Sequence, residues 1–369
     1  MSEGDLLHVV TAETITERRV ATGRLLAWGS GALMGVLALW LGMAEYGLIA
    51  SPFENWRPIL YAYVFWGLCL GVAQVLMFGE RGKRTLFLLP ATLFTVAVVV
   101  FPLGFAVVIA FSDWNLSDPD GRQFNGGANF VEMWQDPFYR NALVNMVWYT
   151  LAILAEYAIA FALALVLSAD IRARKFFRVA FLLPLMLSPV AVSWMVGKSM
   201  LEPRFGPLAS LARWLGVEQP TFFSDPLTAR IWIMIMDGWT FIPLMMIMIL
   251  AGLQSIPREV SEAARVDGAS PLRRFWEVTF PLMLPVSLTA IFIRIIFKLK
   301  IADVIINVTS GGPGGATDSV TSFIWREYRD RSNVGYGTAM ALVYLILIAI
   351  SLTGFMKLVD RWMNPRYLR

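Results

Sequence analysis

Residues 252 to 281 read GLQSIPREVSEAARVDGASPLRRFWEVTFP, and this polar stretch separates two long apolar runs, at 229 to 252 and 278 to 304. A connection between two packed helices usually needs only a few residues, and this one is far longer. We therefore expect the stretch to fold into elements of its own rather than to serve as a plain connector.

The stretch carries the signals of two short helices. Ser255 is placed to cap a helix with Pro257 in its first turn, and Gly268 is placed to end that helix in a left-handed conformation. Ser270 and Pro271 then start a second helix. The pattern predicts a helix-turn-helix outside the membrane, and an amphipathic helix resting on lipid is the alternative.

The flanking apolar runs belong to a set that extends along the chain. Of the 369 residues, 57% are hydrophobic and 16% are charged, whereas soluble domains average roughly 25% charged residues. A membrane-crossing helix needs about 20 apolar residues. Eight runs meet this length: 25 to 44, 59 to 78, 86 to 111, 143 to 167, 179 to 199, 229 to 252, 278 to 304 and 335 to 356. The sequence predicts an all-α, polytopic membrane protein with about eight transmembrane helices, kinked rather than broken at internal prolines.

Basic residues indicate the orientation of these spans. Five segments that would share one side of the membrane hold most of them: Arg18, Arg19 and Arg24; Arg81, Lys83 and Arg84; Arg172, Arg174, Lys175 and Arg178; Arg258, Arg265, Arg273 and Arg274; Lys357, Arg361, Arg366 and Arg369. By the positive-inside bias this side is cytoplasmic, and so are both termini. Arg326, Arg329 and Arg331 fall on the outer side, in a long loop where the bias is weaker. The basic pI therefore reflects topology and does not indicate a nucleic-acid partner.

One cysteine, Cys69, and one histidine, His8, limit the chemistry of the chain. No disulfide can form within the chain, and no Cys/His metal cluster can be assembled. His8 lies in a polar amino-terminal tail, which argues against a Ser-His or Cys-His catalytic pair. We expect no metal site, no cofactor site and no enzymatic activity in this chain.

Charges inside two of the apolar runs are the candidates for a functional site. Two helical faces carry them: Asp237, Thr240, Phe241 and Leu244 in the run at 229 to 252, and Arg294, Phe297, Lys298 and Ile301 in the run at 278 to 304. Charged side chains within a membrane usually face a cavity or one another. Asp237 could neutralise Arg294 or Lys298, or these groups could contact a solute, and the sequence leaves both readings open.

The motif Glu262-Ala263-Ala264, followed by Gly268 and Pro281, resembles the cytoplasmic EAA loop of binding-protein-dependent ABC importer permeases. The segment EAARVDGAS is similar to that of the carbohydrate branch, which includes the maltose and glycerol-3-phosphate systems. Other matches are FLLP, NFVEMWQDPFYRNALVN, FFRVAFLLPLMLSPV and TSGGPGGATDS. The loop ends in Val-Thr-Phe-Pro where the family usually has Ile-x-Leu-Pro. The resemblance extends over about 86 to 360.

The resemblance implies a type I ABC importer permease fold. Residues 1 to 85 would form an amino-terminal tail and two extra helices, and 86 to 369 a six-helix core with a coupling loop at 253 to 281. That loop would sit in a cleft of a cytoplasmic ATPase, with Glu262 as a polar anchor, and a side chain at Gly268 would block the turn. The coupling residues would be Glu262, Ala263, Ala264, Asp267, Gly268, Ala269, Ser270 and Arg274.

The resemblance also implies partners. A second, homologous permease would complete a heterodimer, two ATPase subunits would bind ATP and Mg²⁺, and an extracytoplasmic solute-binding protein would deliver the solute. The location would be a bacterial inner membrane, in contact with its lipid. The glycine-rich segment at 310 to 319 would be a flexible outward loop that meets the binding protein.

The two polar faces coincide with those that contact sugar in maltose-type permeases. Phe297 suits stacking on a sugar ring. Lys298 beside Arg294 departs from those permeases and favours an anionic solute, such as a sugar acid, a sulfonate or a phosphate ester. An ion-gradient-driven secondary transporter, in which Asp237, Arg294 and Lys298 form a proton relay, is the alternative function.

Overall fold

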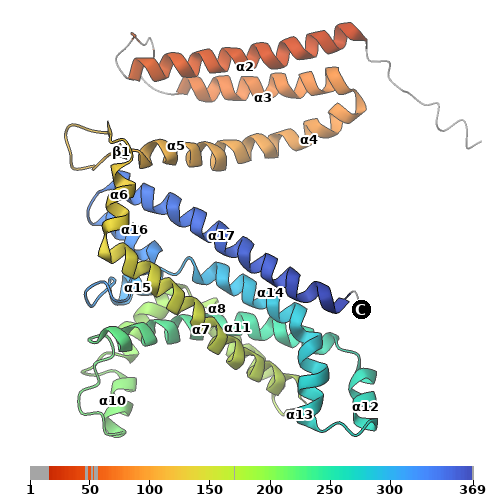
Figure 1. Cartoon of the computed structure of the whole chain (residues 1–369), viewed down its shortest axis with the longest axis vertical. Helices are drawn as coiled ribbons and strands as arrows, with labels where there is room; N and C mark the ends of the chain where they lie inside the picture. Colours follow the sequence, from red (N-terminus) through yellow and green to blue (C-terminus); the bar gives the residue numbers. More distant parts are fainter. Residues whose placement is uncertain (1–15, 46–48, 51–52, 54–56, 170, 368–369) are drawn as a thin grey trace, which may run out of the picture. The chain divides into compact units, whose positions relative to one another are not determined.

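The computed structural model describes residues 16–45, 49–50, 53, 57–169 and 171–367, so His8 lies outside the described residues. The described chain is almost wholly helical (Figure 1). Seven of its helices are long and apolar enough to cross a membrane, and the count is eight when one bent pair is taken as a single span. The predicted fold class and the number of spans are confirmed.

The chain divides into two compact units, Met1–Phe105 and Ala106–Arg369. The division falls inside the third apolar run, and the predicted boundary at 85 stays a prediction. The first unit contains α2 (Glu17–Glu45), α3 (Arg57–Phe78), α4 (Glu80–Thr95) and the π-helix η1 (Val96–Val100), while α5 (Phe101–Ala110) crosses the division. Gly67 and Gly71 of α3 leave the space that Leu93 and Leu86 of α4 fill, so these two helices approach closely.

The second unit contains the remaining elements. After the short antiparallel strands β1 (Ser112–Asp113) and β2 (Gln123–Phe124) they are α6 (Ala128–Gln135), α7 (Pro137–Ser168), α8 (Arg174–Met186), α9 (Pro189–Val192), η2 (Ser193–Met200), α10 (Pro207–Trp214), α11 (Pro226–Ser255), α12 (Arg258–Val266), α13 (Pro271–Arg274), η3 (Phe275–Thr279), α14 (Phe280–Lys298), α15 (Asp303–Val308), α16 (Val320–Arg329) and α17 (Val334–Tyr367). Within this unit α12, α13 and the end of α17 lie at one end, and α6, α15 and α16 at the other (Figure 1).

The two longest buried helices begin at Asp-Pro pairs. The carboxylate of Asp136 accepts a hydrogen bond from the backbone N–H of Phe138 at 2.8 Å, and that of Asp225 accepts one from Leu227 at 3.0 Å. Proline at the first helical position has no N–H to leave unsatisfied. These caps fix where α7 and α11 start, which is 6 and 3 residues before the predicted apolar runs.

The predicted span at 179 to 199 is not a kinked helix but a broken one. The helices α8 and α9–η2 meet at 97°, because Leu187 and Ser188 are extended. The residue before a proline is disfavoured in the helical region, and Pro189 follows Ser188. The hydroxyl of Ser188 then accepts a hydrogen bond from the N–H of Ala191 at 3.1 Å, so a new helix starts there. The prediction of kinks rather than breaks is wrong at this point.

The run at 278 to 304 also ends earlier than predicted. The helix α14 stops at Lys298, and Ile301 lies in the turn that follows rather than on the helical face of Arg294. Tyr344 donates a hydrogen bond to the carbonyl of Leu299 at 2.7 Å, and Ser319 donates one to the carbonyl of Ile301. These two bonds hold the backbone that follows the helix. The last carbonyl of the helix, that of Lys298, accepts the backbone N–H of Ile301 at 3.1 Å.

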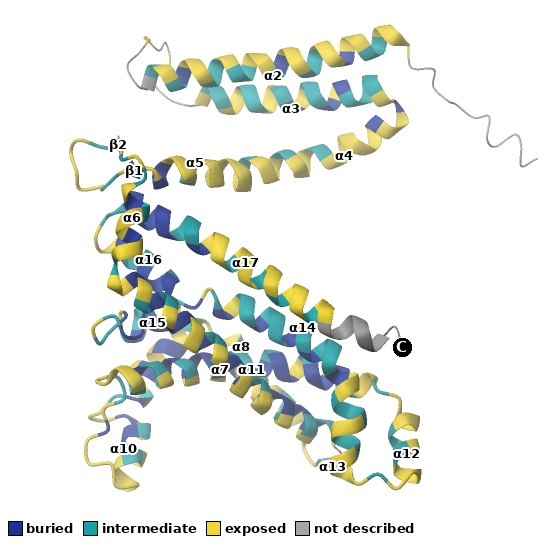
Figure 2. Ribbon diagram, in the orientation of Figure 1, coloured by how far each residue is buried: buried dark blue, intermediate teal, exposed yellow. Residues whose placement is uncertain are grey.

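Two apolar clusters form the core of the second unit, visible as the dark segments of α7 and α11 in Figure 2. One joins Tyr149 and Met236 to α15, α16 and α17. The other joins Ile153 and Met245 to Met283 of α14. Along α7 and α11, the first cluster ends where the second begins. Asp237 lies at this junction on α11, and Glu156 lies within one turn of it on α7.

Candidate functional site

Four charged side chains from three helices meet at the junction of the two apolar clusters. Glu156 comes from α7, Asp237 from α11, and Arg294 and Lys298 from successive turns of α14. The three helices pack against one another. Arg294 and Lys298 are wholly buried, and Glu156 and Asp237 are 4% exposed.

Each cation of this charge cluster contacts both carboxylates. Arg294 donates to Glu156 from Nε at 2.7 Å and from Nη2 at 3.2 Å, and Lys298 donates to Glu156 at 2.7 Å. Both cations also pair with Asp237. Charges in a low-dielectric interior are tolerated only when they are paired and hydrogen-bonded. The cluster meets this condition with two positive and two negative groups.

An aromatic pair covers the cluster. The guanidinium carbon of Arg294 lies 4.5 Å from the centre of the Phe241 ring, and this ring stacks on Phe297 with 5.3 Å between centres. Phe297 is 43% exposed. The Nη1 atom of Arg294 is buried, and no residue that the structure describes forms a hydrogen bond with it. A charged donor and an exposed aromatic face therefore lie next to each other.

The structure brings together Asp237, Arg294 and Lys298. Of the two readings that the sequence left open, this is the one in which Asp237 neutralises the cations. Thr240 is buried, and its hydroxyl donates to the carbonyl of Met236 at 3.0 Å. Leu244 is half-buried. Ile301 is buried in the apolar cluster that contains Tyr149 and Met236. Whether these residues line a solute path stays a prediction.

The sequence reasoning missed Glu156. Glu156 is a carboxylate within the run at 143 to 167, and the rule that singled out Asp237 applies to it equally. Gly238 lies against it, since a Cβ atom at that position would come within 3.3 Å of the Glu156 Cγ. A carboxylate within an apolar run was therefore visible in the sequence. Glu156 is the second carboxylate that the two buried cations need for neutral pairing.

The segment at 253 to 281, for which a coupling role is predicted and which is called the coupling segment below, forms the predicted helix-turn-helix, α12 and α13. The predicted cap at Ser255 is wrong, because α11 continues through Ser255, whose hydroxyl donates to the carbonyl of Gly252 at 2.7 Å. Gly268 has a φ of +78° and ends the turn after α12, which confirms its predicted conformation. The expectation that a side chain there would block the turn is wrong, because a Cβ atom would meet no described atom beyond its chain neighbours within 4 Å. Ser270 accepts a hydrogen bond from the N–H of Arg273 at 3.3 Å, as predicted for the cap of α13.

This segment is exposed in the chain as described (Figure 2). Glu262, Ala263, Asp267, Gly268 and Ser270 are exposed, and Ala264, Ala269 and Arg274 are half-buried. Val266 is 87% exposed between these polar residues. Leu272 of α13 is 69% exposed as well, so the segment leaves two large apolar side chains uncovered.

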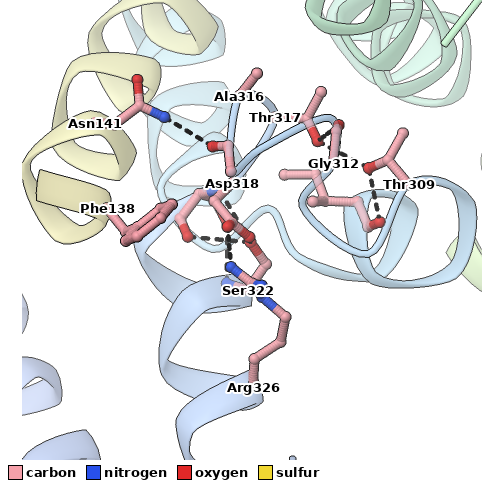
Figure 3. A network of polar contacts seen from close by, with 12 residues as sticks. Phe138, Asn141, Thr309, Gly312, Ala316, Thr317, Asp318, Ser322 and Arg326 are labelled. Atoms are coloured by element: carbon pink, nitrogen blue, oxygen red, sulfur yellow. Dashed lines mark hydrogen bonds and ion pairs between the residues drawn. The ribbon is translucent and has the colours of Figure 1, made fainter. Parts of the chain in front are cut away.

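The glycine-rich segment at 310 to 319 is folded rather than an extended flexible loop (Figure 3). Thr317, Asp318 and Ser319 are buried. The hydroxyl of Thr317 donates to the carbonyl of Gly312 at 2.8 Å. From α7, Asn141 donates to the carbonyl of Gly315 at 2.7 Å. Side chains from distant helices thus bind the backbone carbonyls of the segment.

Asp318 holds this network to α16, and because it lies on the side predicted to be the outer one, it is called the outer polar network below. Its carboxylate accepts a hydrogen bond from the Ser322 hydroxyl at 3.0 Å and pairs with Arg326 (Figure 3). Burial raises the pKa of Asp318 to about 6, although Arg326 opposes this rise. Arg331 pairs with the buried Glu327 at 2.5 Å. Two of the arginines that fell on the outer side are therefore neutralised by carboxylates.

Comparisons with known proteins identify the family. The model of the family described as "binding-protein-dependent transport system inner membrane component" matches residues 64–365. The sulfoquinovosyl glycerol transport system permease of Agrobacterium fabrum is 31% identical over 270 residues, which are 73% of this chain and 87% of the relative. The sn-glycerol-3-phosphate transport system permease of Rhizobium meliloti is 30% identical over 290 residues, 76% of this chain and 96% of the relative.

A third relative, the trehalose/maltose transport system permease of Thermococcus litoralis, is 32% identical over 211 residues, 57% of this chain and 71% of the relative. A solved bacterial alginate ABC transporter, in complex with an alginate pentasaccharide-bound periplasmic protein, includes a chain that matches with a TM-score of 0.66 and 21% identity, over 75% of this chain and 94% of that chain. This structural likeness shows the fold. None of these matches supports an ion-gradient-driven transporter. The chain belongs to the family of binding-protein-dependent transport system inner membrane components, and it is a multi-pass permease subunit of an ABC importer, not an enzyme.

Proposed function

We propose that the chain is one half of a permease that imports a sugar or a sugar derivative, and that it receives mechanical work through the coupling segment. The observation that carries the proposal is the exposed helix-turn-helix α12–α13, with Gly268 in a left-handed turn and Val266 uncovered. This segment lies at one end of the second unit (Figure 1), where a partner can reach it without entering the membrane.

Two cytoplasmic ATPase subunits are the proposed source of that work. One of them would hold α12 in a cleft, with Glu262 and Arg274 as polar contacts and with Ala263, Ala264 and Ala269 allowing close approach. ATP and Mg²⁺ would be bound by these subunits. A second, homologous permease would form the other half of the path, and an extracytoplasmic solute-binding protein would deliver the solute to the opposite side. Both termini would be cytoplasmic, in a bacterial inner membrane.

A sugar-type solute fits the aromatic pair and the charge cluster behind it. The relatives named above transport sulfoquinovosyl glycerol, sn-glycerol-3-phosphate and trehalose or maltose. The stacked pair of Phe241 and Phe297 offers an apolar face of the kind on which sugar rings stack. The guanidinium of Arg294 is wholly buried against Phe241, so it would act on a solute through its charge rather than through a direct contact. Asp237, Thr240, Leu244, Lys298 and Ile301 are the other proposed path residues.

Substituting Gly268 tests the coupling role. Gly268→Asp places a charged side chain in a turn with open space around it, and Asp adopts left-handed conformations more readily than most residues. We expect the turn to survive and the ATPase contact to be lost. Gly216→Asp is the matched control, because Gly216 has a φ of +96° and also lies in open space, but outside the coupling segment.

The measurements are co-purification of the ATPase subunits and ATP-dependent uptake in proteoliposomes. The Gly268→Asp variant should insert at the level of the control and lose both activities, and the control should retain both. Normal uptake by the Gly268→Asp variant would refute the coupling assignment. Uptake without ATP, by this chain alone, would refute the proposed importer.

A further inference from the structure

The net charge of the buried cluster depends on Glu156, which lies on neither of the two helical faces predicted from the sequence. Those faces, on α11 and α14, supply the two cations Arg294 and Lys298 but only one carboxylate, that of Asp237. Their net charge alone would be +1. Glu156 of α7 cancels it, and it is in contact with both cations at 2.7 Å. The cluster is neutral only because this third helix contributes a carboxylate.

Solvent cannot replace Glu156 in that role. Arg294 and Lys298 are wholly buried and Glu156 is 4% exposed, so an uncompensated charge among them would be weakly screened. The interaction of a unit charge with its surroundings at a given distance is several times stronger in such an interior than in water. A change of one charge in the cluster would therefore be felt by a group several ångströms away.

The cluster lies directly behind the exposed aromatic pair. Arg294 touches Phe241, Phe241 stacks on Phe297, and Phe297 is 43% exposed. The unpartnered Nη1 of Arg294 belongs to the same group. A solute that stacks on Phe297 would lie within the field of the cluster and would respond to its net charge.

We propose that Glu156 is a specificity-determining residue, which holds the cluster neutral and so makes this half of the path favour an uncharged sugar over an anionic one. The inference rests on the proposed sugar permease function. It reverses the expectation that Lys298 beside Arg294 favours an anionic solute, because both cations are already matched by carboxylates.

A purely structural role for Glu156 makes a different prediction. If the carboxylate only fastens α7 to α14, its loss lowers the thermal midpoint of unfolding and leaves the preference between two solutes unchanged. If it sets the charge of the site, its loss changes that preference in a direction given by the sign of the remaining charge. The preference is therefore the informative measurement.

Three variants change the net charge of the cluster in known steps. Glu156→Gln gives +1 and keeps an acceptor for Lys298, Lys298→Met gives −1, and the double variant restores zero. The probes are glucosylglycerol and sulfoquinovosyl glycerol, which differ in a hydroxyl against a sulfonate. Their dissociation constants are measured by equilibrium dialysis against the purified permease pair in nanodiscs, without the binding protein.

We expect the ratio of the two dissociation constants to shift about fivefold toward the sulfonate in Glu156→Gln, about fivefold away from it in Lys298→Met, and to return within about twofold of the original in the double variant. Opposite shifts in the two single variants cannot come from partial unfolding. If the single variants still bind the probes and their ratios of dissociation constants are unchanged, the inference about Glu156 is overturned, while the proposed sugar function stands. If Glu156→Gln does not fold, an unshifted Lys298→Met variant overturns the inference. If the unaltered pair binds neither probe, the proposed sugar function fails, and the inference with it.

Discussion

The buried charge cluster and the outer polar network both pair buried polar groups, but with different kinds of partner. In the cluster, four ionised groups from α7, α11 and α14 neutralise one another, over sequence separations of up to 142 residues. In the outer network, Asp318 meets Ser322 and Arg326 within one turn or two of α16, and Asn141 and Thr317 bind backbone carbonyls.

The difference follows from the surroundings of each region. The cluster lies within membrane-spanning helices, where no water can stabilise a charge left alone, so every member needs an ionised partner. The outer network lies beyond the spans, and its arginine Arg326 is 23% exposed on its side chain. Removing one group should therefore be far more damaging in the cluster than in the network.

The largest expected effect comes from Asp237→Ala. It leaves two wholly buried cations with the single carboxylate of Glu156, and breaking a buried ion pair costs about 3 to 5 kcal/mol. We expect loss of folded protein after detergent extraction, measured by size-exclusion chromatography and thermal unfolding. Asp303→Ala is the control, because Asp303 is exposed. Equal midpoints for the two variants would contradict the proposed dependence on pairing.

A smaller effect is expected from Gly311→Ala in the outer network. Gly311 has a φ of +82°, and a Cβ atom there would overlap the carboxylate of Asp318. Left-handed backbone and overpacking together predict a loss of about 2 to 4 kcal/mol. Gly314→Ala is the matched control, since Gly314 has a φ of +57° but open space around it. A loss in Gly314→Ala as large as in Gly311→Ala would attribute the effect to backbone conformation alone.

The smallest effect is a dependence of stability on pH through Asp318. Burial raises its pKa from 3.8 to about 6, so the folded state holds the proton more tightly than the unfolded state. The stabilisation is present below pH 4 and is lost as the pH rises through 6, by about 1 kcal/mol between pH 5 and pH 7.

Thermal unfolding at these two pH values measures this dependence. The unaltered chain should unfold at a lower temperature at pH 7 than at pH 5, and Asp318→Asn should reduce the difference. Burial also raises the pKa of Glu327, so a part of the difference should persist in the variant. A difference that Asp318→Asn leaves unchanged would show that Asp318 does not contribute.

The spans, the coupling segment and three of the four clustered charges could be predicted from the sequence. Apolar runs and the helix-end signals at Gly268 and Ser270 depend only on neighbouring residues, so they predict local structure without knowledge of tertiary contacts. The pairing of Asp237 with Arg294 and Lys298 required only the rule that buried charges seek partners. Glu156 obeyed the same rule, but its partners are 138 and 142 residues away, and the sequence does not show which helices touch.

The remaining errors have a common physical cause. The composition of the segment at 310 to 319 predicts a flexible loop, but its polar groups find donors on α7 and α16 that only the tertiary structure supplies. Likewise, the residues after Lys298 leave the helix, and Tyr344 and Ser319, which are distant in sequence, donate to the carbonyls of Leu299 and Ile301 there. The break at Ser188 could have been predicted from the Ser-Pro pair. It was not predicted, because prolines are generally tolerated within membrane helices.

That break has a consequence for how the chain enters the membrane. The helix α8 has 13 residues, and α9 and η2 have 4 and 8, whereas a helix that inserts by itself needs about 20. The exposed backbone at the break also has to be covered by protein rather than lipid. Because α11 packs against α8, α9 and η2, we expect this segment to settle in the bilayer together with α11, after both have been synthesised. Membrane integration of this region would then be a step of tertiary folding, in an order that differs from the order of translation.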